Sequence, residues 1–273
     1  MPTPLTQADF LRIRRFMYEA SGVDLSPSKH AMVEARLTKR VSELGLRGFS
    51  EYWNVVSAPE SEAERQHVIN ALSTNETYFF REPDHFSWLA EFARANQTPG
   101  QPFRVWSAAA SSGEEAYSAA ISLTEALGEK GAFEILATDI NTEVLKEARS
   151  AIYPRDEVRK LPPNFIQRYF LWGRDEYRGM LMVAPEVSRR VRFQQINLNQ
   201  CERSAIGLFD VIFLRNVMIY FNPSTKESLL AQICDKLKDN GVLVISHAET
   251  ITGLNTPLVQ IRPSLYRKRN NNE

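Results

Sequence analysis

The chain has 273 residues, of which 43% are hydrophobic and 24% charged, as in ordinary soluble globular proteins. Its 33 lysines and arginines balance its 33 aspartates and glutamates, so no overall field attracts it to nucleic acid or anionic lipid. The sequence shows neither a signal peptide nor an apolar run of membrane-spanning length, and we therefore expect a cytoplasmic protein without membrane insertion.

Residues 1–83 are predicted to form a small helical domain, because they contain amphipathic runs and few strand signals. Thr6 and Asp9 have the spacing of a capping box for a first helix. A second helix should begin at Ser26, which precedes a proline, and end at Gly45. A chain of this length exceeds the usual size of a single core, which agrees with a second, larger domain.

A basic stripe is predicted on the second helix of this domain. Lys29, Arg36 and Arg40 are separated by seven and four residues, which places them within about 40° of one another on a helix. Charge runs usually mean only a solvated face. The alternative is a surface on which an acidic partner docks.

The segment from Phe103 to Gly113 predicts a strand followed by a turn of small residues, and a helix opens at once with Glu114 and Glu115. In open α/β sheets such a turn lets a nucleotide-like ligand approach the backbone. A blunt turn without a ligand is the alternative, since Ala109 stands where a glycine-rich loop would have glycine. Two carboxylates at the helix start favour a neutral or cationic ligand over a pyrophosphate.

Strands and helices alternate from this point onward, which predicts an α/β domain with a mostly parallel sheet covered on both faces. Asn141 should cap the helix that follows the second strand, and Ser224 with Glu227 should cap a later helix that runs to Lys238. Further strands are predicted at residues 133–140, 209–217 and 241–247.

Residues 161–190 interrupt this alternation and predict a small antiparallel insertion, with Gly173 and Gly179 at turn positions. The insertion is either short strands that serve packing or a subdomain whose exposed edge accepts a partner peptide as an added strand. Segments near 258–261 and 265–268 are expected to pair as a terminal hairpin.

Polar residues follow the predicted strands at the edge where open α/β sheets bind ligands. Asp139 ends the second strand, where its carboxylate can accept both ribose hydroxyls; an ordinary helix cap is the alternative, but Asn141 already fills that role. Asn197 follows another strand, so that its amide suits an adenine edge while Leu198 packs on the ring.

Arg215 and Asn216 close a buried apolar strand, and Tyr220 follows one turn later. Charged and amide groups at such a position are costly unless they are partnered, which favours a site over a structural accident. The stretch 74–81 mixes polar and aromatic residues and is either an interdomain packing strip or a means of presenting Arg81 to a carboxylate.

Neither the cysteines nor the histidines show the sequence spacing of metal ligands, so we predict no metal. The two cysteines, Cys201 and Cys234, are far apart and are expected to be reduced thiols. The histidines are His30, His67, His85 and His247.

Together these segments resemble the chemotaxis receptor glutamate methyltransferases of the CheR type. The resemblance implies a class I methyltransferase fold dependent on S-adenosylmethionine (SAM), with a Rossmann-like doubly wound sheet. It implies an all-helical domain at 1–83 and a SAM-binding domain at 84–273, with an inserted antiparallel β-subdomain at about 161–190. The matching segments are STNETYFFRE (73–82), VWSAAASSGEEAYS (105–118), ATDINTEVL (137–145), FDVIFLRNVMIYFN (209–222) and VISHAE (244–249).

The resemblance also implies an activity and a site. The protein would transfer the methyl group of SAM to receptor glutamate carboxylates for sensory adaptation, leaving S-adenosylhomocysteine. Arg81 and Tyr220 would flank the reacting centre, Asp139 would bind the ribose, and Glu114 or Glu115 would face the methionine end. The implied cofactor contacts are Asn75, Thr77, Arg81, Ala109, Glu114, Glu115, Asp139, Asn197, Leu198, Leu214, Arg215 and Asn216.

The implied partners are the cytoplasmic signalling domains of chemotaxis receptors, whose acidic helices would meet the stripe of Lys29, Arg36 and Arg40. Docking of a receptor C-terminal peptide on the β-subdomain, and binding of regulatory adaptor proteins, stay open. Two alternatives remain: a SAM-dependent methyltransferase with another substrate, and a non-catalytic scaffold that senses SAM or S-adenosylhomocysteine.

Overall fold

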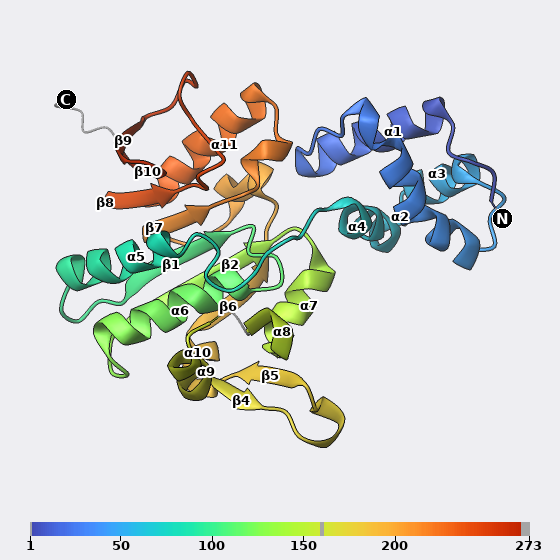
Figure 1. Ribbon diagram of the computed structural model, residues 1–273. Helices are drawn as coiled ribbons and strands as arrows, with labels where there is room; N and C mark the ends of the chain where they lie inside the picture. The colour runs from blue at the N-terminus through green and yellow to red at the C-terminus, as the bar shows by residue number, and fades with distance from the viewer. Residues whose placement is uncertain (1, 159–160, 269–273) are drawn as a thin grey trace.

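A computed structural model describes residues 2–158 and 161–268, and it separates a helical bundle from a larger sheet-containing part (Figure 1). The bundle packs around apolar side chains such as Phe10, Leu37 and Val68. Its helices within the described residues are α1 (Gln7–Ser21), η1 (Pro27–Lys29), α2 (His30–Glu43), α3 (Phe49–Ser57) and α4 (Glu62–Leu72).

The caps of the first helices follow the sequence in part. The hydroxyl of Thr6 accepts from the Asp9 N–H and donates to the Asp9 carboxylate, which confirms the predicted cap of α1. The predicted second helix is divided into a 3₁₀ turn and α2, because the Ser26 hydroxyl bonds to Ser28 and caps no backbone N–H.

Within the described residues seven strands form the main sheet in the order β6-β2-β1-β7-β8-β10-β9. The first five run parallel, and β10 pairs antiparallel with both β8 and β9, which confirms the predicted terminal hairpin. The strands are β1 (Phe103–Ala108), β2 (Phe133–Asp139), β6 (Val191–Gln195), β7 (Phe209–Leu214), β8 (Leu237–Val244), β9 (Leu258–Arg262) and β10 (Leu265–Lys268).

Helices cover both faces of this sheet (Figure 1). Because neighbouring residues of a strand point to opposite faces, Val105 joins the core under α5 and α6, and Trp106 joins the core under α11. The doubly wound α/β class predicted from the sequence is therefore confirmed. The covering helices are α5 (Pro83–Asn96), α6 (Glu114–Leu127), α7 (Thr142–Ser150), η3 (Leu198–Arg203) and α11 (Pro223–Lys236).

One predicted helix cap is wrong. The side chain of Asn222, and not that of Ser224, accepts the backbone N–H of Thr225 at the start of α11. Pro223 fixes the first helical residue and so places the cap immediately before it. The helix ends at Lys236, two residues earlier than predicted, because the chain then enters β8.

A second, antiparallel sheet has the strand order β3-β5-β4 and lies below the main sheet in Figure 1. It is pinned to the main core by edge-to-face contacts of Phe79 with Tyr153 and Phe170. Its strands begin at residue 152, earlier than the predicted insertion at 161–190. Its elements are β3 (Ile152–Pro154), α8 (Arg155–Val158), α9 (Pro163–Tyr169), β4 (Phe170–Trp172), η2 (Asp175–Tyr177), β5 (Met180–Val183) and α10 (Pro185–Ser188).

The segment 73–82 joins the two parts and crosses the carboxyl ends of the main strands before α5 begins (Figure 1). Helix α5 packs against α6 and belongs to the core of the larger part. None of the helices described above combines the length and the apolar character that a bilayer crossing requires.

Candidate functional site

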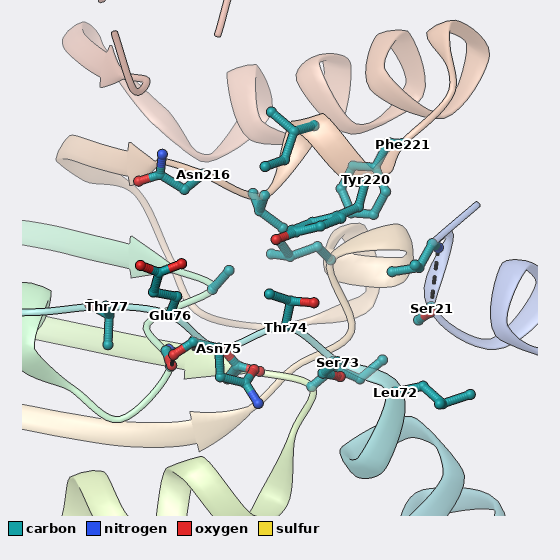
Figure 2. Close-up of a pocket in the computed structure, with 18 of the residues that line it drawn as sticks. Ser21, Leu72, Ser73, Thr74, Asn75, Glu76, Thr77, Asn216, Tyr220 and Phe221 are labelled. Carbon is teal, nitrogen blue, oxygen red and sulfur yellow. Dashed lines mark hydrogen bonds between the residues drawn. The ribbon is translucent and has the colours of Figure 1, made fainter. Parts of the chain in front are cut away.

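A cavity of about 410 Å³ opens beside β1, where the order of the parallel strands reverses: β2 lies on one side of β1 and β7 on the other. Crevices at such switch points bind ligands in open α/β sheets, and this volume suits a small molecule. Figure 2 shows the segment from Leu72 to Thr77 along one side of the cavity, with Tyr220 and Asn216 across from it. The predicted residues that line it are Lys29, Asn75, Thr77, Arg81, Ala109, Glu115, Asp139, Asn197, Leu198, Arg215, Asn216 and Tyr220.

Two predicted cofactor contacts are placed elsewhere. Leu214 is fully buried in the core under α11. Glu114 is buried on the side of the small sheet, where its carboxylate accepts from the Ser112 hydroxyl at 2.8 Å. The structure therefore brings Glu115, and not Glu114, to the cavity wall.

The burial of Glu114 predicts an unusual pH dependence of stability. Burial, with smaller contributions from the charges of Glu157 and Glu147, raises the pKa of this carboxyl to about 7. From pH 4.5 to 7 the unfolded chain ionises this group while the folded chain keeps it protonated. The free energy of unfolding therefore falls by up to about 3 kcal/mol as the pH rises through this range. Below pH 4.5 the group is protonated in both states, and the stability that depends on it is fully present. Urea unfolding of wild type and Glu114→Gln at pH 5 and pH 8 should show this loss only in the wild type.

A Glu91→Gln variant serves as the control for that prediction, because Glu91 is exposed on α5. Its unfolding free energy should follow that of the wild type at both pH values. If the unfolding free energies of Glu114→Gln and of the wild type changed equally with pH, the loss of stability could not be assigned to Glu114.

The turn after β1 adopts the left-handed conformation without the usual glycines. Ala109 has a φ of 67° and Ser111 a φ of 50°. Such residues cost about 1–3 kcal/mol each unless their surroundings hold them. The Ser111 N–H donates to Asp139 at 2.9 Å, and its hydroxyl donates to the Asn75 carbonyl at 2.8 Å. The strained turn is therefore fixed from both sides of the cavity.

Asp139 lines the cavity with its carboxylate already oriented. One oxygen accepts from the Ser111 N–H and the other from the Asn141 N–H, both at 2.9 Å. Burial raises the pKa of Asp139, and these backbone hydrogen bonds act in the opposite direction. Each carboxylate oxygen can still accept a second hydrogen bond, which leaves room for two ligand hydroxyls.

A triad of charged side chains, made of the buried Arg215 and the partly buried Glu82 and Glu115, forms the wall beside this turn. The guanidinium of Arg215, 1% exposed, contacts Glu115 at 2.8 Å and Glu82 at 2.9 Å. Glu115 also accepts from the Ser107 hydroxyl at 2.7 Å. Two carboxylates and one guanidinium leave the triad with a net charge of −1, which favours a cationic ligand. Of the two carboxylates at the helix start from which the sequence predicts such a ligand, only Glu115 belongs to the triad.

Glu249 holds the loop after β7, a role that the sequence analysis does not assign. Its carboxylate accepts the N–H groups of Asn216 and Met218 at 2.9 Å and that of Ser246 at 3.1 Å. Burial raises its pKa, and the backbone donors oppose that change. These bonds fix Asn216 at a φ of 58° and start the short helix η4 (Met218–Tyr220).

Comparison with known proteins agrees with this geometry. Residues 75–265 match the family described as CheR methyltransferase, SAM binding domain, and residues 8–73 match the CheR methyltransferase all-alpha domain. The chain belongs to the CheR methyltransferase family. It is 44% identical over 251 residues to the chemotaxis protein methyltransferase of Salmonella typhimurium, a match that covers 92% of this chain and 86% of that protein.

Two further relatives match this chain with similar identity and coverage. The chemotaxis protein methyltransferase of Escherichia coli K12 is 42% identical over 92% of this chain and 87% of its own length. Chemotaxis protein methyltransferase 2 of Pseudomonas aeruginosa is 41% identical over 89% of this chain and 87% of its own length.

The helical bundle of this CheR-family chain closes one side of the cavity. The Asn197 amide donates to the Ala20 carbonyl at the end of α1 at 2.7 Å, and the Asp24 N–H donates to the Tyr220 carbonyl at 3.0 Å. These contacts tie the bundle to the loops of the sheet. Residues that the sequence analysis missed line the cavity from the bundle side: Ser21, Val23, Asp24, Leu25 and Met32.

The basic stripe of this CheR-family chain has internal partners. Arg40 forms an ion pair with Glu64 at 2.6 Å, and Glu64 also accepts from the Tyr52 hydroxyl at 2.7 Å. Arg36 donates to the Ser73 carbonyl at 2.8 Å, while Lys29 lines the cavity. Arg36 and Arg40 therefore join α2 to the end and to the first turn of α4, and a docking role for the stripe stays a prediction.

Arg81 lies on the cavity wall of this CheR-family chain with much of its donor capacity available. Its Nη1 donates to the Glu76 carbonyl at 2.9 Å, and its guanidinium lies 5.7 Å from the centre of the Tyr78 ring. A guanidinium has five N–H donors, so Arg81 can also bind a carboxylate.

Proposed function

We propose that the protein transfers the methyl group of SAM to glutamate side chains of chemotaxis receptors, giving methyl esters and S-adenosylhomocysteine. The observation that supports this most is a single cavity that presents the Asp139 carboxylate, the net negative triad and the Arg81 cation. The names of the relatives, which are chemotaxis protein methyltransferases, favour receptors as the substrate.

The described residues suit SAM, which carries a sulfonium, an ammonium and a carboxylate and so has a net positive charge. Asp139 would accept the two ribose hydroxyls with the capacity that its backbone contacts leave. Glu115 would face the ammonium group. The Asn197 side chain, which keeps one N–H beyond its contact with Ala20, would meet the adenine together with Leu198.

The chemistry requires orientation more than proton transfer. SAM supplies a methyl group on a positively charged sulfur, and a glutamate carboxylate is already ionised at neutral pH, so no general base is needed. Holding the two reactants in line contributes up to about 7–11 kcal/mol in favourable cases. We assign to Arg81 the binding of the incoming carboxylate, and to Tyr220 the adjustment of its position by a hydrogen bond.

The test is methyl transfer from labelled SAM to purified receptor signalling domains, with base-labile methyl esters as the readout. Asp139→Ala should lose most SAM binding in calorimetry and most transfer. SAM binding without transfer to any receptor domain would favour the non-catalytic scaffold. Transfer to another substrate class, with none to receptors, would favour the second alternative.

We further propose that the edge of the small sheet binds a receptor peptide as an added strand. β5 lies in the middle of that sheet and β4 at its edge, where Leu171 and Trp172 are about half exposed. An exposed apolar edge strand is the usual site of strand addition. Such a tether raises the effective concentration of the substrate without changing the reacting groups.

Leu171→Glu is therefore expected to raise KM for a full-length receptor about tenfold or more while kcat stays unchanged. Activity on a receptor fragment without its C-terminal tail should not change. Leu208→Glu is the matched control, since Leu208 has the same 48% exposure and lies outside the small sheet. Equal KM values for the two variants on the full-length receptor would contradict the proposal.

A further inference from the structure

Three potential metal ligands meet behind the Arg215 triad, outside the cavity. Glu82 precedes α5, His85 lies in its first turn, and His247 follows β8. One ligand atom from each side chain lies within 4.8 Å of the other two. Because His85 and His247 are far apart in the chain, their sequence spacing gives no sign of this cluster, and the prediction of no metal rested on spacing alone.

The distances within the cluster resemble those around a metal ion. His85 Nδ1 lies 3.3 Å from a carboxylate oxygen of Glu82, but the two groups lack the geometry of a hydrogen bond. Two ligands at about 2.0–2.1 Å from a tetrahedral Zn²⁺ are about 3.3–3.4 Å apart. The separation of His85 and Glu82 therefore fits two neighbours in the coordination shell of one ion.

His85 is the strongest sign that the cluster binds something. Its side chain is 3% exposed, and neither ring nitrogen has a hydrogen-bond partner among the described residues. Buried polar groups are nearly always paired, since an unpaired one lowers the stability of the folded protein. Its ring stacks obliquely on that of His247, with centroids 4.6 Å apart, so an ion beside one imidazole lies within reach of the other.

The charges around the cluster suit a divalent cation. The ion would sit among carboxylates, since Glu82 is itself a member of the cluster. Asp84 lies 3.1 Å from His247 and adds a carboxylate. Glu82, Asp84 and Glu115 against the single cation Arg215 leave a net charge of −2.

We propose that Glu82, His85 and His247 bind a Zn²⁺ ion, with Asp84 near enough to complete the site. Two imidazoles and a carboxylate are a ligand set that zinc accepts in tetrahedral geometry. None of the three lines the cavity, so the ion does not touch the methyl donor. It fixes the position of Glu82, whose carboxylate also accepts from Arg215, the Ser246 hydroxyl and the His247 N–H, and it so stabilises the triad.

The experiment is calorimetric titration of Zn²⁺ into the full-length protein after chelator treatment and removal of the chelator. The wild type should bind one equivalent. His247→Ala removes a ligand whose side chain is 46% exposed and should fold normally, yet bind Zn²⁺ at least about tenfold more weakly. His67→Ala, on α4 and outside the cluster, is the matched control and should bind like the wild type.

Thermal unfolding gives a second measurement that does not depend on activity. Added Zn²⁺ should raise the Tm of the wild type and of His67→Ala, and it should raise the Tm of His247→Ala much less. The proposal is overturned if the wild type binds no Zn²⁺. It is overturned equally if His247→Ala keeps wild-type affinity and stoichiometry, which would place the ion elsewhere. His85→Asn should repeat the effect of His247→Ala if it folds, and otherwise His247→Ala decides.

Discussion

Arg215→Met is expected to lower the free energy of unfolding by about 3–5 kcal/mol and to weaken SAM binding about 100-fold or more. Methionine keeps most of the volume but leaves the partly buried carboxylates of Glu82 and Glu115 without their shared cation. Removing one member of a buried charge cluster costs more than the cluster contributes, because the remaining charges cannot be solvated. Urea unfolding and calorimetry with SAM measure the two effects separately.

The matched control for that prediction is Arg15→Met, which removes an exposed arginine from an ion pair with Glu19. Surface substitutions of this kind change stability by at most about 0.5 kcal/mol. Adding Glu82→Gln to Arg215→Met should recover part of the lost stability, since it removes one unpaired charge. A single variant as stable as Arg15→Met would show that the triad is not a coupled unit.

The parts of the site on the main sheet could be predicted because they depend on local patterns. Apolar runs fix where each strand ends, and in a parallel sheet the carboxyl ends meet at one edge. Asp139, Asn197 and Arg215 follow three such runs, and all three line the cavity. The turn of small residues around Ala109 could also be predicted from the sequence, but its left-handed backbone conformation could not.

Other parts of the site depend on contacts between distant segments, which no local pattern records. Glu249 was seen in a matching motif, yet its three backbone contacts to Ser246, Asn216 and Met218 require the fold. The choice between Glu114 and Glu115 also depends on packing, because two neighbours at a helix start point in different directions.

The helical bundle shows the same limit. The stripe of Lys29, Arg36 and Arg40 was predicted from helix geometry alone, and that geometry cannot show that Glu64 on another helix binds Arg40. The bundle residues on the cavity wall were missed because the rule that ligands bind at the carboxyl ends of parallel strands says nothing of a neighbouring helical domain. Their contacts with the Asn197 and Tyr220 loops make the bundle part of the site as well as a candidate docking surface.

Arg81→Ala is expected to reduce kcat about 100- to 1,000-fold while SAM binding weakens less than about tenfold. The reason is that a carboxylate without a fixed cation samples many orientations, and few of them are in line with the methyl group. SAM binding should fall a little, because Arg81 also holds the Glu76 carbonyl in the segment beside the cavity. Initial rates at saturating SAM give kcat, and calorimetry gives the affinity for SAM.

Arg81→Lys separates charge from geometry in this prediction. Lysine keeps the positive charge but not the planar pair of donors that matches a carboxylate, so its kcat should lie between those of wild type and Arg81→Ala. A lysine variant as slow as the alanine variant would mean that two-point binding, and not charge, orients the substrate. Unchanged turnover in Arg81→Ala would contradict the assigned role. An equal loss of turnover and of SAM affinity would instead make Arg81 a cofactor ligand. Another cation on the cavity wall, such as Lys29, would then have to bind the receptor carboxylate.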